Sequence, residues 1–124
     1  EEIPSKRNFQ IASSEFENEV LKTLEKLNIK YSVEPNFEGV RPDFLVESGE
    51  KKIVIEAKAW GDLIPLSQLR READYLNKLS NIGGVSRVVL VTKKKLHISV
   101  VKQLVSDRIL VVSLSELGSV LKDV

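Results

Sequence analysis

Two short segments of the chain carry acidic and basic side chains at a spacing suited to metal-assisted phosphodiester chemistry. Asp43 follows Pro42, and twelve residues separate it from Glu56, which lies with Lys58 at the end of the alternating run Lys51–Lys58. Successive side chains of a strand point to opposite faces, so Glu56 and Lys58 share one face. Pro42 favours extended backbone, which predicts that Asp43 begins a neighbouring strand within reach of Glu56.

Two carboxylates and one ammonium at a single place suit a hard divalent cation. Carboxylates about 4 Å apart repel each other by roughly 4 kcal/mol at an effective dielectric near 20, so they rarely both stay ionised without a cation. Mg²⁺ prefers oxygen ligands and is commonly held by one or two carboxylates, water and substrate phosphate. A water bound to such an ion is a candidate nucleophile, which Lys58 would orient or deprotonate. The sequence therefore predicts a Mg²⁺ or Mn²⁺ site that includes Asp43 and Glu56.

These residues resemble the motif of the PD-(D/E)xK nuclease superfamily, whose members have the restriction-endonuclease-like fold. Pro42-Asp43 is similar to the first half of the motif and Glu56-Ala57-Lys58 to the second half. The resemblance covers most of the chain and is strongest to the small Mrr-type and archaeal Holliday-junction-resolvase groups. It implies a DNA endonuclease in which Asp43 and Glu56 are metal ligands, the Ala57 carbonyl is a further ligand, and Lys58 is the catalytic lysine.

Glu17 is a further candidate metal ligand. Helical spacing places it beside the apolar residues Val20 and Leu24, and related nucleases often bring an acid of the first helix toward the metal. Ser14, three residues earlier, forms a capping-box signature with Glu17, and this interpretation is equally good. Glu19 lies on the polar face of the same predicted helix, so we expect it to be solvated.

Several polar side chains are candidates for substrate binding. Some members of the superfamily carry a glutamine-tyrosine pair after the lysine strand, and Gln68 is a candidate for such a contact. Tyr75 lies seven residues further on, not four, so we interpret it as ordinary helix surface. Clustered basic side chains either bind phosphates or form solvated loops, and both interpretations stay open. The clusters that could bind phosphate are Arg70 with Arg71, and Lys93, Lys94 and Lys95.

The hydrophobic pattern predicts an α/β domain with a mixed sheet flanked by helices. Residues 1–12 are interpreted as an N-terminal arm and residues 13–124 as one nuclease-like domain. The order αβββαβαβα requires both antiparallel and helix-linked strands, as in the restriction-endonuclease-like fold. Helices are predicted at about 14–28, 66–79, 98–105 and from 115 onward, and strands at 29–34, 43–47, 51–58, 87–92 and 109–112.

Composition narrows the function further. With no Cys and one His, the chain has no disulfide, no Cys/His zinc site and no cysteine nucleophile. A net charge of +1 is not the footprint of a strong DNA binder, so any DNA-binding face requires local clustering of basic residues. No apolar run is long enough for a transmembrane helix or signal peptide, and we expect a cytoplasmic protein without membrane contact. The absence of Met suggests a processed chain or a domain of a larger protein.

The sequence is best interpreted as a Mg²⁺-dependent deoxyribonuclease that cuts DNA strands at internal phosphodiester bonds. Small nucleases of this type often pair to reach two strands, so a homodimer is a further expectation. The alternative is a nucleic-acid-binding or assembly module that keeps the fold without cutting. Titration with Mg²⁺ separates the two, because only the enzyme should gain stability from the ion. The structure and sequence of the preferred DNA are not specified by these residues.

Overall fold

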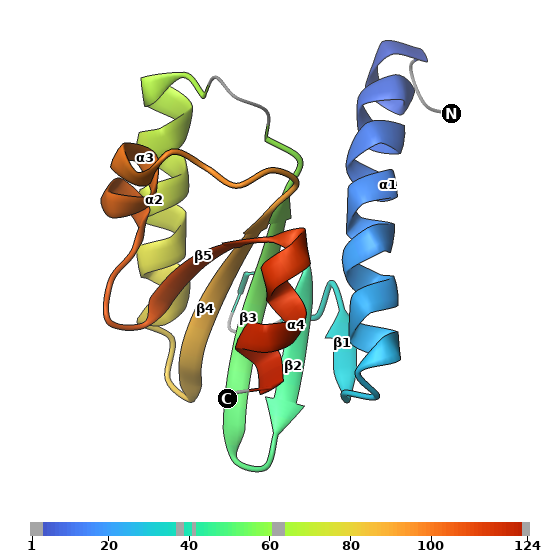
Figure 1. Cartoon of the computed structure of the whole chain (residues 1–124), viewed down its shortest axis with the longest axis vertical. Coiled ribbons are helices and arrows are strands. Elements are labelled where there is room, and N and C mark those ends of the chain that lie inside the picture. The colour runs from blue at the N-terminus through green and yellow to red at the C-terminus, as the bar shows by residue number, and fades with distance from the viewer. Residues whose placement is uncertain (1–3, 37–38, 41, 61–63, 123–124) are drawn as a thin grey trace.

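A five-stranded sheet crosses the described part of the molecule, and its strands follow one another in chain order (Figure 1). The computed structural model describes residues 4–36, 39–40, 42–60 and 64–122. The first three strands along the chain pair antiparallel, whereas the last three pair parallel through helical connections. The predicted order of elements and the mixed sheet are confirmed. The elements are α1 (Pro4–Lys26), β1 (Tyr31–Val33), β2 (Phe44–Ser48), β3 (Lys51–Lys58), α2 (Leu66–Ser80), β4 (Val85–Thr92), α3 (Ile98–Leu104), β5 (Ile109–Ser113) and α4 (Leu114–Lys122).

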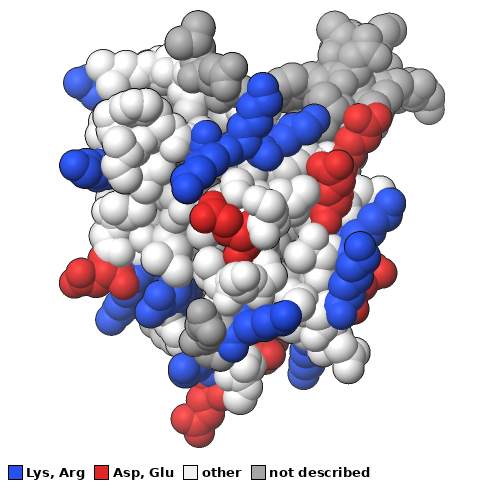
Figure 2. All heavy atoms as spheres, viewed as in Figure 1, with Lys and Arg blue, Asp and Glu red and all other residues white. Residues whose placement is uncertain are grey.

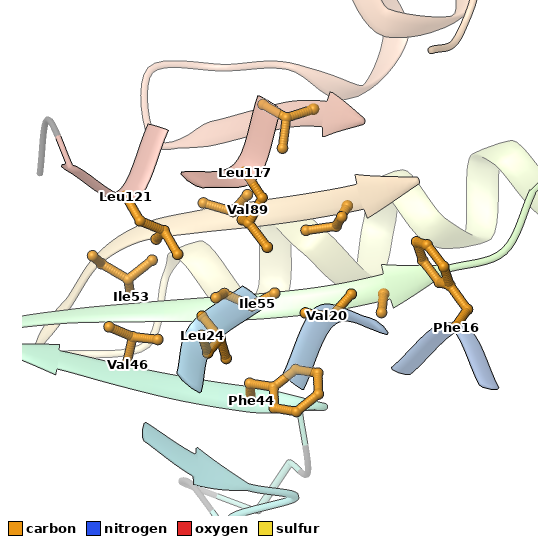
Figure 3. Packing of buried hydrophobic residues seen from close by; sticks show 13 residues of the cluster. Phe16, Val20, Leu24, Phe44, Val46, Ile53, Ile55, Val89, Leu117 and Leu121 are labelled. Carbon is orange, nitrogen blue, oxygen red and sulfur yellow. The ribbon is translucent and has the colours of Figure 1, made fainter. Parts of the chain in front are cut away.

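Each face of the sheet packs against two helices. Helices α1 and α4 cover one face, and the alternation of β3 sends Ile53, Ile55 and Ala57 into that layer (Figure 3). Helices α2 and α3 cover the other face, where Val54 of β3 is fully buried. Glu56 and Lys58 have the same parity as Val54, so they point toward the α2 layer. The two-residue period of β3 therefore places its polar side chains on one face, as the sequence predicts.

The first helix is longer than predicted. Helix α1 begins at Pro4, so residues 4–12 are helical, and Ser14 lies inside the helix and is not its N-cap. The capping-box interpretation of Ser14 and Glu17 is therefore wrong. Pro4 suits the first helical position, because its φ is already helical and its missing N–H has no partner there in any helix. The division of the chain at residue 13 stays a prediction.

Strand β1 is short because the backbone turns sharply on both sides of it. Asn28 and Glu34 have positive φ angles of 55° and 46°, which strands do not accommodate. The N–H of Glu34 donates to the carbonyl of Asp43 at 2.9 Å. The end of β1 thus fixes the backbone of Asp43 just before β2 begins.

The remaining helices and strands begin and end within two residues of their predicted bounds. Helix α4 begins at Leu114, and its first turn is capped by Glu116, which accepts from the N–H of Ser113 at 3.0 Å. The predicted start at Ser115 is therefore one residue late. Among the described helices, none combines the length and the apolar character needed to span a lipid bilayer.

Candidate active site

Asp43 and Glu56 lie opposite each other across β2 and β3. The antiparallel register pairs Phe44 with Ile55, which brings the preceding Asp43 next to Glu56. The N–H of Asp43 donates to Glu56 Oε1 at 3.2 Å, and the N–H of Ala57 donates to Asp43 Oδ2 at 2.8 Å. These reciprocal hydrogen bonds hold both carboxylates at the carboxyl end of β3. The structure thus brings together the two acids that the sequence singles out.

Lys58, the last residue of β3, lies near Asp43 and Glu56. Its ammonium forms an ion pair with a residue that the sequence analysis missed. Lys58 Nζ lies 3.6 Å from Oε1 of Glu72, a residue of α2. Glu72 is only 7% exposed, because it occupies the buried face of α2 between Leu69 and Leu76. The detectable signal was an acid three residues after one buried leucine and four before the next.

Tyr75 also contacts the site, so its interpretation as ordinary helix surface is wrong. Its hydroxyl donates to Glu56 Oε1 at 3.4 Å, and its side chain is partly buried against the hydrophobic core on the α2 side of the sheet. Burial, followed by repulsion from the Glu56 and Asp43 carboxylates, raises the pKa of Tyr75 above its ordinary value. Tyr75 therefore keeps its proton and acts as a hydrogen-bond donor to Glu56.

The acids of the site resist joint ionisation. Burial raises the pKa of Glu56 to about 8, with further contributions from Asp43 and then Glu72. Burial also raises the pKa of Asp43, although the Ala57 N–H and the Lys58 ammonium oppose this increase. The pKa of Glu72 is raised by burial and partly lowered by Lys58. Among the described residues of the site, the Lys58 ammonium thus faces three buried or partly buried carboxyl groups, which repel one another when all three ionise.

A divalent cation fits this set of donors. In the described part of the chain, no cluster of three or more His, Asp or Glu side chains forms a ready-made metal cage. Two carboxylates are nevertheless what Mg²⁺ commonly takes from a protein, with water and substrate completing its shell. Glu56 Oε1 and Asp43 Oδ2 accept the backbone hydrogen bonds above, so an ion would be bound mainly by the other oxygen of each carboxylate. A cation there would also favour ionisation of the pair.

Glu17 approaches the site from α1, on the opposite side of the sheet from α2. It is half-buried, and its pKa is raised first by burial and then by repulsion from Asp43 and Glu34, whereas Lys58 lowers it. The carboxyl group of Glu17 therefore lies within the electrostatic influence of Asp43 and Lys58. Ala57 enters the site through its N–H, and the ligand role of its carbonyl stays a prediction.

The predicted substrate-binding residues are exposed, and their role stays a prediction. Gln68, Arg70 and Arg71 lie on the exposed side of α2, and Lys93–Lys95 follow β4. Figure 2 shows basic and acidic side chains interspersed on one face, with basic groups gathered over the loop between β4 and α3. Arg41, two residues before Asp43 in the sequence, and residues 61–63 lie outside the described residues.

Comparisons with known proteins give evidence for the fold. No model of a known protein family matches the chain, and no match was found among curated proteins. Among solved structures, the chain is similar to the small subunit of the heterodimeric restriction endonuclease R.BspD6I. The TM-score is 0.56 at 16% sequence identity, and the match covers 87% of this chain and 67% of that subunit. The mixed sheet and its flanking helices thus form a restriction-endonuclease-like fold.

Proposed function

We propose that the chain is a metal-dependent endonuclease that hydrolyses phosphodiester bonds of DNA. The observation that carries the proposal is the meeting of Asp43, Glu56 and Lys58 at the end of β3, with Asp43 anchored by the Ala57 N–H. Raised pKa values at both acids support a site that is completed by a cation. The fold of the neighbouring restriction-endonuclease subunit supports the same class of reaction.

The residues of the proposed site have two roles, which are binding of the metal ion and orientation of the attacking water. Asp43 and Glu56 would hold Mg²⁺ or Mn²⁺, and Tyr75 would keep the Glu56 carboxylate in place. When bound, the ion neutralises charge on the phosphodiester and lowers the pKa of a nearby water. As an ammonium, Lys58 would orient that water toward phosphorus, or as a neutral amine it would accept the water's proton, while the new P–O bond forms and the bond to the leaving sugar oxygen breaks.

Binding of DNA would depend on the exposed basic clusters. Gln68, Arg70 and Arg71 project from α2, whose inner face contacts the site, and Lys93–Lys95 are exposed after β4. Each phosphate contact made by such a residue adds slightly less than about one unit to the salt dependence of binding. The structural neighbour is one subunit of a heterodimeric enzyme, which supports action with a second subunit. A homodimer is the form that we propose.

Incubation of the purified chain with labelled DNA tests the proposed activity. Linear duplex, branched and single-stranded DNA are each combined with Mg²⁺, Mn²⁺ or a chelator. We expect cleavage of at least one substrate with either metal and none with the chelator, because Asp43 and Glu56 need the ion to act. Binding of DNA without cleavage of any substrate would contradict the endonuclease and favour the non-cleaving module.

Replacement of Glu17 by glutamine tests its proposed role as a third acidic ligand. We expect the Mg²⁺ concentration for half-maximal cleavage to rise about 10-fold, and the Mg²⁺-induced rise in melting temperature to shrink. Glu19→Gln is the matched control, because Glu19 is an exposed acid on the same helix. Equal Mg²⁺ requirements for Glu17→Gln, Glu19→Gln and the wild type would show that Glu17 does not bind the ion.

A further inference from the structure

Glu72 is a carboxyl group where the pattern of α2 calls for an apolar side chain. It lies on the buried face of the helix with Leu69, Leu76 and Leu79, and it is only 7% exposed. A buried acid lowers stability unless a partner compensates for its lost hydration. A leucine at this position would pack without that penalty, so the carboxylate points to a role beyond packing.

The partner of this carboxylate is the ammonium of Lys58. Glu72 Oε1 lies 3.6 Å from Lys58 Nζ, whereas Oε2 is buried without a hydrogen-bond partner among the described atoms. The Lys58 side chain is 38% exposed, so its ammonium lies between the buried carboxylate and solvent. An ammonium has three N–H donors. When one N–H is directed at Glu72, the other two can donate to the attacking water and to the phosphate of a substrate.

Helix α2 supplies one partner for each polar side chain at the end of β3. Tyr75 donates to Glu56, and Glu72 pairs with Lys58. Residues three apart on a helix are about 5–6 Å from each other, and residues two apart on a strand are about 7 Å from each other. The two pairs therefore form side by side, and α2 fixes the carboxylate and the ammonium of β3 from the same direction.

We propose that Glu72 is a positioning residue that holds the Lys58 ammonium in its working orientation. The catalytic part of this inference depends on the proposed function. A free lysine side chain has about 2 kcal/mol of rotamer entropy to lose when it is held in place. Contact with Glu72 restricts the side chain before substrate arrives, so less of that entropy is lost during the reaction. Glu72 itself contacts neither water nor phosphate in this arrangement.

Glu72→Gln tests the proposal because it keeps the volume of the side chain and removes its charge. We expect kcat to fall about 10- to 100-fold, by analogy with the range seen when residues that orient metal ligands are replaced. We expect KM for DNA to stay within about threefold, because Glu72 does not contact the substrate. The Mg²⁺-induced rise in melting temperature should persist, because Asp43 and Glu56 stay in place. Asp74→Asn is the matched control, since Asp74 is an exposed acid on the same helix, and it should change none of these quantities.

A readout without substrate separates this proposal from the endonuclease proposal. NMR relaxation of the Lys58 ε-methylene group should show a restricted side chain in the wild type and in Asp74→Asn, and a mobile one in Glu72→Gln. If the wild type does not cleave DNA but shows this difference, the endonuclease proposal fails and the positioning contact stands. An unchanged kcat, equal Lys58 mobility, or loss of the Mg²⁺-induced stabilisation in Glu72→Gln would each overturn the positioning role.

Discussion

Glu56→Gln is expected to abolish Mg²⁺-dependent cleavage and, at the same time, to raise the melting temperature of the metal-free protein at pH 8. The pKa of Glu56 is raised from 4.5 to about 8 in the folded chain. Between these values the unfolded chain is ionised while the folded chain holds a proton, so the wild type loses stability as the pH rises. Each pKa unit corresponds to about 1.4 kcal/mol. Glutamine cannot ionise, so the variant avoids this loss.

Melting temperatures measured with a chelator between about pH 4 and pH 8, together with cleavage measured with Mg²⁺, check both halves of this expectation. Below the unfolded pKa the two proteins should be similar in stability, and the difference should grow toward pH 8. Glu50→Gln is the control, because Glu50 is an exposed acid in the turn between β2 and β3. A Glu56→Gln variant that melts with the wild type at every pH would show that Glu56 ionises normally.

Lys58→Met is expected to reduce cleavage about 10²- to 10⁴-fold, the range associated with loss of an acid–base group. It should also lower the melting temperature at pH 8, because Glu72 then keeps a buried carboxylate without its cation. Breaking a fully buried pair costs roughly 3–5 kcal/mol. The loss here should be smaller, since the Lys58 side chain is 38% exposed.

The double variant Lys58→Met/Glu72→Gln distinguishes the catalytic from the structural part of this loss. Removal of both charges should return the melting temperature to near the wild-type value, whereas cleavage should stay at the level of Lys58→Met. Lys51→Met, at the exposed start of the same strand, is the control. Recovery of cleavage in the double variant, or no recovery of stability, would contradict the roles assigned to Lys58 and Glu72.

The hairpin of β2 and β3 was predictable because its geometry is local. A two-residue period assigns Glu56 and Lys58 to one face, and an antiparallel neighbour brings Asp43 opposite Glu56 with few residues between them. The chain order of helices and strands was equally clear from the hydrophobic pattern. The start of α1 was not, because the capping signature at Ser14 also occurs inside a helix that begins at Pro4.

The contribution of α2 to the site was missed for two different reasons. The hydrophobic pattern that predicts this helix depends on its apolar residues, which leaves out the acid that shares their buried face, Glu72. Tyr75 was judged by its distance in sequence from Gln68, but its contact with Glu56 depends on how α2 lies over β3. Such a contact is set by tertiary packing, which the period of a single helix does not specify.

The reactive groups of the site precede, in the sequence, one of the strands that support them. All acids and the ammonium of the site come from residues 17–72, whereas β4, which pairs with β3 from Lys52 to Lys58, begins only at Val85. During synthesis these reactive groups therefore leave the ribosome before β4 does. A product that stops after α2 would carry these reactive groups and the β2–β3 hairpin without the strand that pairs with the other edge of β3.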